Sequence, residues 1–363
     1  MSISSSDLKH ALRKTDFPFC AREALTRIEQ IYAPNAMGRP PSNKQIDLAA
    51  EVMAEFVFCE ADRRGSRKRR LSCIQELQLL EVLCDYFTYS GASNEPARNA
   101  VFMALFPASN AERCRLLAKL VSMAISTKNT PVLNATGVWM QHLGSATQGS
   151  LELAQGLVKD YFVLVPRAGS GLQDLPQLAP YFTSSLLTAV AEIYTGEGPT
   201  SAPPQPLLEV VTQWVADLPT LCIAALPAEP LHRTSPTTPY AGLFRWCILA
   251  PLHFHPAPAV LLYSRLHLAL LESLLECRQL QPGRLEGSVM PQQLMMTARS
   301  MIRSNGSAEA MQDAIDRFAQ ALQLILDSRL LAQSGQLDLF QLLDTLPRNR
   351  LMALVLRKHR GQS

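Results

Sequence analysis

One helical segment restricts the possible folds of this chain more than any other. In residues 71–87, LSCIQELQLLEVLCDYF, polar side chains recur three or four residues apart at Gln75, Gln78, Glu81 and Asp85. Side chains with this spacing share one narrow stripe of an α-helix. The other positions are mainly apolar, with Ile74, Leu77, Leu80, Cys84 and Phe87 on one flank and Leu79, Val82, Leu83 and Tyr86 on the other. So thin a polar stripe predicts a helix that is packed on several sides.

Helical periodicity recurs from end to end, and no alternating run bounded by hairpin turns argues for a sheet. The sequence therefore predicts an all-α protein. The predicted helices cover residues 6–14, 19–32, 44–60, 73–89, 95–106, 111–126, 132–142, 151–165, 179–194, 207–216, 220–226, 240–249, 259–280, 291–303, 308–331, 337–346 and 348–359.

These helices have mostly short connections and no exact repeat period. This pattern favours antiparallel helical hairpins stacked side by side, as in an irregular HEAT-like or armadillo-like α-solenoid. Prolines cluster at 198–206, 227–239 and 251–258, which predicts loops there. We predict an N-terminal helical block over 1–195, a Pro-rich linker over 196–206 and a C-terminal helical block over 207–363. One continuous array is the alternative.

Positive charge is concentrated in one short run, Arg63, Arg64, Arg67, Lys68, Arg69 and Arg70. Without these six residues, 28 basic residues face 31 acidic ones, so the body of the chain is mildly acidic. The run is a candidate nuclear-import or polyanion-binding patch, and a solvated loop between two helices is the competing interpretation. Direct RNA binding is the weaker alternative because no aromatic side chains interleave with the cations.

A second basic region lies near the C-terminal end of the sequence. Arg357, Lys358 and Arg360 fall in a stretch from Thr345 to Ser363 that contains no acidic residue. They are candidates for contact with an acidic partner or with the negative end of the last helix. A frayed terminus is the alternative.

The sequence contains no strong motif for catalysis, phosphate binding or metal binding. Two glycine pairs, at 169–171 and 196–198, lack the strand, loop and helix setting of a phosphate-binding loop. His253, His255 and His267 have no acidic or Cys-x-x-Cys partner at metal-ligand spacing, so we expect ordinary loop and packing residues. The sequence therefore predicts no catalytic residue, no metal site and no cofactor.

The eight cysteines are widely spaced in apolar surroundings, which is typical of buried thiols in a reducing compartment. The two most hydrophobic tracts are interrupted by charged residues, Arg245 in one and Arg265 and Glu272 in the other. Neither tract has the pattern of a membrane span, so no membrane partner is expected.

A set of segments in fixed order resembles the subunit 15 family of the metazoan Integrator complex. They are EFVF (55–58), LQLLEVLCDYF (77–87), LLAKLVSMA (116–124), PVL (131–133), LVKDYFVLVP (157–166), AGLFRWCILAPL (241–252), LLYSRLHLALL (261–271) and DRFAQALQLILDSRLL (316–331).

This resemblance implies a non-catalytic helical scaffold subunit in the nucleus, with the cytoplasm as a further location. It implies other Integrator subunits as partners, and a role in joining the peripheral module of subunits ten, thirteen and fourteen to the rest of the complex. The complex acts in small nuclear RNA 3′-end processing and in attenuation of RNA polymerase II transcription. RNA contact would be indirect or weak. The alternative function is an RNA-binding helical adaptor that uses residues 63–70.

Overall fold

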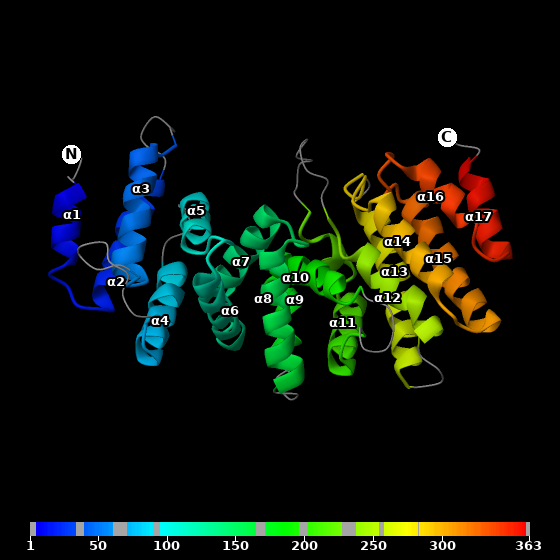
Figure 1. Ribbon diagram of the computed structural model, residues 1–363, viewed down its shortest axis with the longest axis horizontal. Coiled ribbons are helices and arrows are strands. Elements are labelled where there is room, and N and C mark those ends of the chain that lie inside the picture. The colour runs from blue at the N-terminus through cyan, green and yellow to red at the C-terminus, as the bar shows by residue number, and fades with distance from the viewer. Residues whose placement is uncertain are drawn as a thin grey trace. The chain divides into compact units, whose positions relative to one another are not determined.

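The computed structural model describes residues 5–33, 40–60, 71–89, 95–164, 171–195, 202–226, 237–253, 258–281 and 283–360. Within these ranges the secondary structure is helical, apart from one isolated parallel bridge between Val289 and Leu331. The chain forms two compact units, residues 1–143 and 144–363 (Figure 1).

The first unit contains seven α-helices and one π-helix in its described residues. They are α1 (Ser5–Leu12), α2 (Phe19–Tyr32), α3 (Asn43–Val52), the π-helix η1 (Met53–Val57), α4 (Cys73–Tyr89), α5 (Glu95–Leu105), α6 (Ala111–Ser126) and α7 (Thr130–Leu143). Helix α4 packs against α2, α6 and α7, and α5 packs against α2 and α7. A chain of aromatic contacts through Phe87, Phe102 and Phe106 lies in the core between these helices.

The second unit is built from two rows of helices. Its elements are α8 (Gln148–Val158), the π-helix η3 (Lys159–Leu164), α9 (Leu175–Leu178), α10 (Pro180–Ile193), α11 (Gln205–Asp217), the 3₁₀-helix η6 (Pro219–Ile223), α12 (Tyr240–His253), α13 (Pro258–Leu280), α14 (Pro291–Arg303), α15 (Ala308–Asp327), α16 (Gln336–Leu343) and α17 (Arg350–Arg360).

Each α-helix from α10 to α15 contacts the next but one α-helix in chain order, so that α10 contacts α12 and α11 contacts α13. One row is therefore α10, α12, α14 and α16, and the other is α11, α13, α15 and α17. Contacts of α12 with α13 and α15 join the rows. This two-layer alternation is the packing of a helical array, so the predicted all-α, solenoid-like fold class is confirmed.

Helix α12 forms the centre of the second unit because its sequence is apolar on every side. All residues from 240 to 252 are buried, as expected for a helix without a polar face. Gly242 lets α12 approach α10 closely, because a Cβ atom at this position would lie 2.6 Å from Cβ of Ala191 on α10. The one charged side chain, Arg245, donates to the Thr195 carbonyl at 2.7 Å and to Ser300 Oγ at 2.9 Å.

The helix predicted over 73–89 is present as α4, but its first turn is packed differently from the prediction. Leu79, Val82 and Leu83 are buried as expected. Ile74 and Leu77, assigned to a packed flank, are exposed, and Glu76 is buried instead. The multi-sided packing therefore applies to the later turns of α4 and not to its start.

Several predicted α-helices end or change type earlier than expected. The helices predicted over 44–60 and 151–165 pass into π-helix at Met53 and Lys159, and the segment predicted over 220–226 is the 3₁₀-helix Pro219–Ile223. The helix predicted over 308–331 ends at Asp327. The short helix α9 was not predicted. Hydrophobic spacing cannot separate these helix types over a single turn, because their periods differ too little.

The division of the chain also differs from the predicted blocks. The contacts separate residues 1–143 from 144–363, whereas the sequence suggested a linker at 196–206. Helix α10 precedes that segment and packs against η6 and α12, which follow it. Residues 196–201 lie outside the described residues, so the linker itself stays a prediction.

Candidate interaction surfaces

The candidate basic patch, Arg63, Arg64, Arg67, Lys68, Arg69 and Arg70, lies outside the described residues, but both of its flanks are described. On the N-terminal side, Arg113 of α6 binds the Glu60 carboxylate through Nε at 2.9 Å and Nη2 at 2.7 Å. The same guanidinium lies 4.2 Å from the centroid of the Phe58 ring. A two-point ion pair and a cation–π contact together fix the chain at Glu60.

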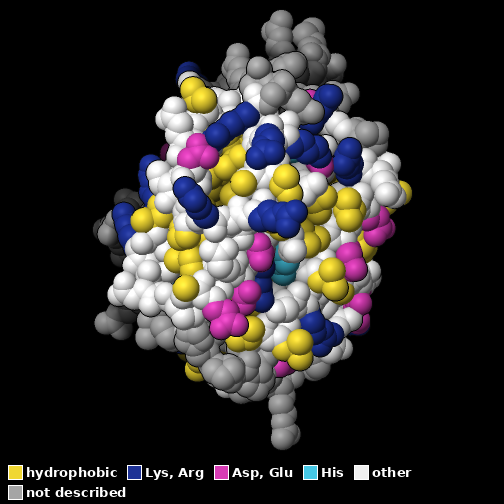
Figure 2. Space-filling view, turned by 90° about the vertical axis from the view of Figure 1, so that its right-hand side faces the viewer, with side chains coloured by type: hydrophobic (Ala, Val, Ile, Leu, Met, Phe, Trp, Pro, Cys, Tyr) yellow, Lys and Arg dark blue, Asp and Glu magenta, His cyan; other side chains and the backbone are white. Residues whose placement is uncertain are grey.

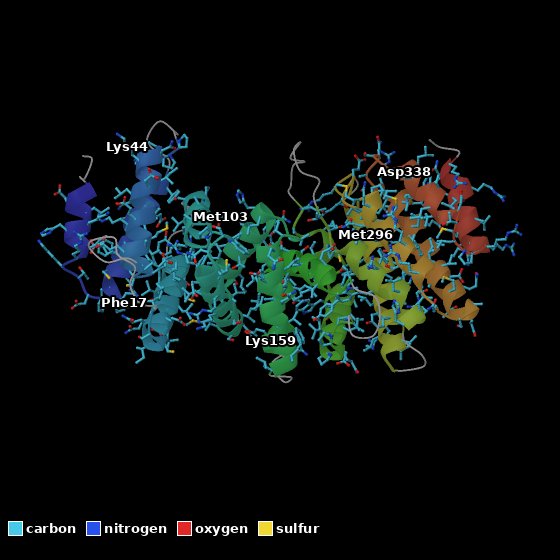
Figure 3. All side chains as sticks on the ribbon, in the orientation of Figure 1. Phe17, Lys44, Met103, Lys159, Met296 and Asp338 are labelled. Atoms are coloured by element: carbon cyan, nitrogen blue, oxygen red, sulfur yellow. The ribbon has the colours of Figure 1, made fainter. Side chains whose placement is uncertain are left out.

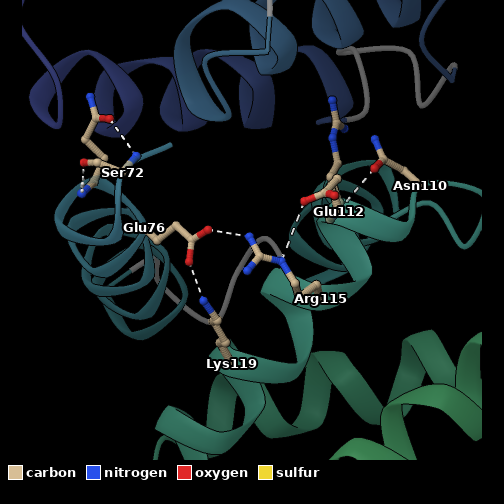
Figure 4. A network of polar contacts seen from close by, with 8 residues as sticks. Ser72, Glu76, Asn110, Glu112, Arg115 and Lys119 are labelled. Atoms are coloured by element: carbon tan, nitrogen blue, oxygen red, sulfur yellow. Dashed lines mark hydrogen bonds and ion pairs between the residues drawn. The ribbon is translucent and has the colours of Figure 1, made fainter. Parts of the chain in front are cut away.

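On the C-terminal side of the run, α4 begins with a reciprocal cap. The Ser72 backbone N–H donates to Gln75 Oε1 at 3.1 Å, and the Gln75 backbone N–H donates to Ser72 Oγ at 3.3 Å. One turn later, Glu76 accepts bonds from Arg115 and Lys119 of α6 (Figure 4). The hydrogen bond from Lys119 is the main cause that lowers the pKa of Glu76, and burial opposes it.

Helix α6 therefore contacts both flanks of the basic run. Arg113 holds the residue that precedes it, and Arg115 and Lys119 hold the helix that follows it. The chain enters and leaves residues 61–70 at fixed points of the first unit. The three α6 cations were not singled out by sequence reasoning, because their acidic partners lie 39 to 53 residues away in the chain.

The C-terminal candidates lie on α17, at the end of the second unit shown in Figure 2. On this face, Lys and Arg side chains gather in the upper half around hydrophobic side chains. Lys358 Nζ donates to the two carboxylate oxygens of Asp327 at 2.8 and 3.0 Å. Arg360 Nη2 donates to the Phe340 carbonyl at 3.1 Å and also pairs with Asp344. Arg357 is exposed on the same helix.

Two of the three predicted contact residues thus have intramolecular partners. Asp327 is the last residue of α15, and Asp344 follows α16, so these ion pairs fasten α17 to the rest of its unit. A contact of Arg357, Lys358 or Arg360 with another protein stays a prediction.

Helix α13 presents a row of exposed leucines that the sequence analysis did not single out. Leu261, Leu268 and Leu275 are 66%, 56% and 43% exposed and lie seven residues apart. Residues at this spacing lie on the same side of a helix. The exposed charged residues Arg265 and Glu272 lie between them. The seven-residue leucine spacing is the signal in the sequence that could have identified this row.

The opposite side of α13 belongs to the core. Leu266, Leu270 and Leu274 are fully buried, and the helix packs against α11, α12 and α15. Single exposed apolar side chains also occur elsewhere, such as Met296 on α14, labelled in Figure 3. Scattered residues of that kind are normal on protein surfaces. Three exposed leucines in one helical row make this side of α13 a candidate docking surface.

His267 and five of the cysteines are buried as packing residues, whereas Cys73 is exposed and Cys59 and Cys114 are partly buried. His267 is buried against the Phe244 ring, and its Nε2 lies 3.0 Å from Gln320 Oε1. Burial lowers the pKa of His267 to about 4, so the imidazole is neutral at pH 7. His255 lies outside the described residues. Burial raises the pKa of the Cys84 thiol to about 11 and that of Cys247 to about 12, which disfavours the reactive thiolate.

Among the described residues, no group of three or more His, Cys, Asp or Glu side chains is arranged to hold a metal ion. In the same part of the chain, no helix has the length and hydrophobicity needed to cross a membrane. The fold defines a class of protein: an all-α helical array whose described surface carries a row of exposed leucines and several exposed basic side chains.

Comparison with known proteins gives the particular family. The sequence model of the family described as Integrator complex subunit 15 matches residues 6–348. The chain therefore belongs to the Integrator complex subunit 15 family, and the resemblance seen in the sequence is confirmed.

Curated relatives are similar over nearly the whole chain. Integrator complex subunit 15 of Drosophila melanogaster is 34% identical over 392 residues, covering 99% of this chain and 100% of the relative. The protein of the same name from Danio rerio is 32% identical, covering 97% of this chain and 80% of its own length. That from Homo sapiens is 30% identical, covering 97% of this chain and 86% of its own length.

Proposed function

We propose that this chain is a non-catalytic scaffold subunit of the Integrator complex. In this role it joins the peripheral module of subunits ten, thirteen and fourteen to the rest of the complex, in small nuclear RNA 3′-end processing and attenuation of RNA polymerase II transcription. The observation that carries the proposal is the family membership, which spans residues 6–348. Other Integrator subunits are the partners that this membership implies, and the nucleus is the expected location.

The geometry of the described residues supports a binding role. On α13, exposed leucines occupy one side of a helix whose other sides are buried. Such a helix keeps its shape without a partner, so its exposed side is ready for docking and little order is lost on association. His267 and the buried thiols belong to the residue types best suited to acid–base or nucleophilic chemistry, and they lie packed in the core, away from the surface.

Affinity purification from nuclear extract tests this function. The tagged chain is expressed at its natural level and recovered under mild salt, and the bound proteins are identified by mass spectrometry. We expect Integrator subunits to be the major proteins recovered, with subunits ten, thirteen and fourteen among them. A tagged, unrelated helical-array protein is the control. Recovery of no Integrator subunit above this control would refute the proposal.

A second candidate function, an RNA-binding adaptor, is favoured by the fixed flanks of the basic run. The described residues on both sides of this cationic segment are anchored to α6, through Glu60 on one side and Glu76 on the other. Replacement of Arg67, Lys68, Arg69 and Arg70 by alanine should then abolish salt-sensitive RNA binding by the purified chain, because each phosphate contact releases counterions.

The matched control replaces four exposed cations of the second unit, Arg299, Arg348, Arg350 and Arg357, by alanine. Binding is measured by fluorescence anisotropy at several salt concentrations. Binding that is unchanged in the 67–70 variant would reject the basic run as an RNA site, and it would leave the scaffold proposal untouched.

A further inference from the structure

We propose that the exposed side of α13 binds a second copy of this chain, with the two α13 helices antiparallel. The stripe that would form the contact consists of Leu261, Arg265, Leu268, Glu272 and Leu275, which we call the α13 stripe. The inference goes beyond the scaffold function and is independent of it, because it concerns the association of this chain with itself.

The leucines of the α13 stripe have the spacing of a helix–helix seam. Leu261, Leu268 and Leu275 occupy one position of three successive heptads and span about 21 Å at 1.5 Å per residue. Leu271, half-buried, lies three residues after Leu268 and widens the apolar strip. A seven-residue repeat of this kind buries its leucines when it meets a second helix with the same repeat.

The two charged residues of the α13 stripe favour a second α13 helix as its partner and favour an antiparallel arrangement of the two helices. Arg265 and Glu272 follow Leu261 and Leu268 by four residues each, so they hold equivalent positions in successive heptads. Their midpoint falls at residues 268–269, and the midpoint of the leucine row is Leu268 itself. A single two-fold axis that passes near Leu268 can therefore pair the leucines of two copies with each other and, at the same time, the charged residue of each copy with the opposite charge of the other.

In an antiparallel pair about that axis, Leu261 of one copy faces Leu275 of the other, and Leu268 faces Leu268. Arg265 then lies within about 1.5 Å, one residue of rise, of the level of Glu272 in the second copy. In a parallel pair the leucine row would still meet itself, but Arg265 and Glu272 of the two copies would lie on opposite sides of the seam, so neither charge would reach an opposite charge of the second copy. The stripe is thus complementary to itself in the antiparallel arrangement, as a two-fold interface requires.

Contacts on the buried side of α13 hold the α13 stripe in a fixed orientation. On the buried side of α13, Ser273 Oγ lies 2.7 Å from the Tyr240 hydroxyl, and Ser264 Oγ accepts a bond from Arg317 of α15 at 2.8 Å. His267 is held by Gln320 of α15. These contacts fix the rotation of α13, so the leucines need no rearrangement before docking.

A stripe of four helical turns is smaller than a standard interface, which buries about 800 Å² on each partner. We therefore expect a reversible, concentration-dependent dimer in the micromolar range. Sedimentation velocity of the full-length chain from about 1 to 100 µM measures this, with those concentrations set by the affinity expected for a small interface. The expected result is a monomer at the lowest concentration and a dimer that grows with concentration.

Three variants test the geometry. Leu268→Glu places two carboxylates on the two-fold axis and should give a monomer throughout. Arg265→Glu turns two attractive pairs into two repulsive ones and should weaken the dimer about tenfold or more. The charge swap Arg265→Glu with Glu272→Arg restores both pairs and should return most of the affinity. Leu337→Glu, at a 69% exposed leucine of α16, is the matched control and should dimerise like the unaltered chain.

Crosslinking provides a second readout. Leu268→Cys should form an intermolecular disulfide under mild oxidation, because this position meets its own copy on the axis, and Leu337→Cys should not. Circular dichroism of each variant shows whether it is folded.

A monomer at every concentration would overturn the proposal, as would a dimer that survives Leu268→Glu. Failure of the charge swap to recover affinity would overturn the antiparallel pairing. If the folded Leu268→Glu variant lost binding to another Integrator subunit while the unaltered chain stayed monomeric, the occupant would be that subunit. Loss of all Integrator partners with dimerisation intact would instead refute the scaffold function and leave this inference standing.

Discussion

At the scale of single residues, the ionisable groups in the interior are neutral or have partners from distant parts of the chain. Arg113 reaches Glu60 across 53 residues, and Arg245 reaches Ser300 across 55. No local pattern in the sequence could have paired these residues, because helical spacing relates only side chains three or four positions apart. Their partners are set by which helices become neighbours.

His267 gives a prediction for stability against pH. Burial lowers its pKa in the folded protein to about 4, whereas the unfolded value is 6.5. The stabilisation by the neutral imidazole is therefore complete above pH 6.5 and is lost as the pH falls from 6.5 towards 4, because the unfolded chain takes up the proton first. At pH 5 the loss is about 2 kcal/mol, from 1.36 kcal/mol per pH unit.

Replacing His267 by glutamine should remove this slope. Urea unfolding of both proteins at pH 7 and pH 5 measures the change, and we expect the free energy of unfolding of His267→Gln to vary less between the two. His142→Gln, at an exposed position, is the control and should keep the slope of the unaltered chain. An equal pH dependence in His267→Gln and the unaltered chain would contradict the assignment.

At the scale of helices, the existence and order of most elements could be predicted from the sequence, and so could both ends of the helices over 19–32, 73–89, 111–126 and 291–303, whereas the ends of several others could not. The helix predicted to reach residue 331 ends at Asp327 in a Schellman motif, in which the Leu330 N–H donates to the Ile325 carbonyl. Arg329 occupies the left-handed position at φ 57° that glycine usually holds. Lys128 ends α6 in the same way at φ 54°. Without glycine at position 329, the sequence carried no glycine stop signal for α15, whereas the end of α6 at Ser126 was predicted correctly.

The candidate surfaces were predictable to different degrees. The basic composition of residues 348–360 identified a charged end, but its ion pairs with Asp327 and Asp344 depend on the packing of α15, α16 and α17. The leucine row of α13 was visible as a spacing, and only the packing of the other sides shows which leucines face outward. When apolar residues surround a helix, its sequence does not show which side is exposed, because that depends on which helices pack against it.

The crossing of α10 and α12 gives a prediction at this scale. Gly242→Ala would place a methyl group 2.6 Å from Cβ of Ala191, both on helices that are buried against each other. Relief requires α10 and α12 to move apart, and overpacking of this kind costs about 1–3 kcal/mol. Thermal and urea unfolding should show a destabilisation within that range. Gly171→Ala is the control, since an added Cβ there meets no atom within 4 Å. Equal stabilities of the two variants would show that the helices are not so closely packed.

At the scale of the whole molecule, the chain combines two compact helical units with several separate exposed features. The flanks of the basic run belong to the first unit, and the α13 stripe and the basic end of α17 belong to the second. In the proposed scaffold role, exposed features on both units would contact more than one partner. Membership of the Integrator complex subunit 15 family supplies the assembly in which such contacts would be made.

The joining role is tested most directly by reconstitution. The module of subunits ten, thirteen and fourteen is immobilised, and the retention of the remaining Integrator subunits is measured with and without the purified chain. We expect the remaining Integrator subunits to be retained only when this chain is present. Equal retention in its absence would contradict the proposal that it connects the two parts.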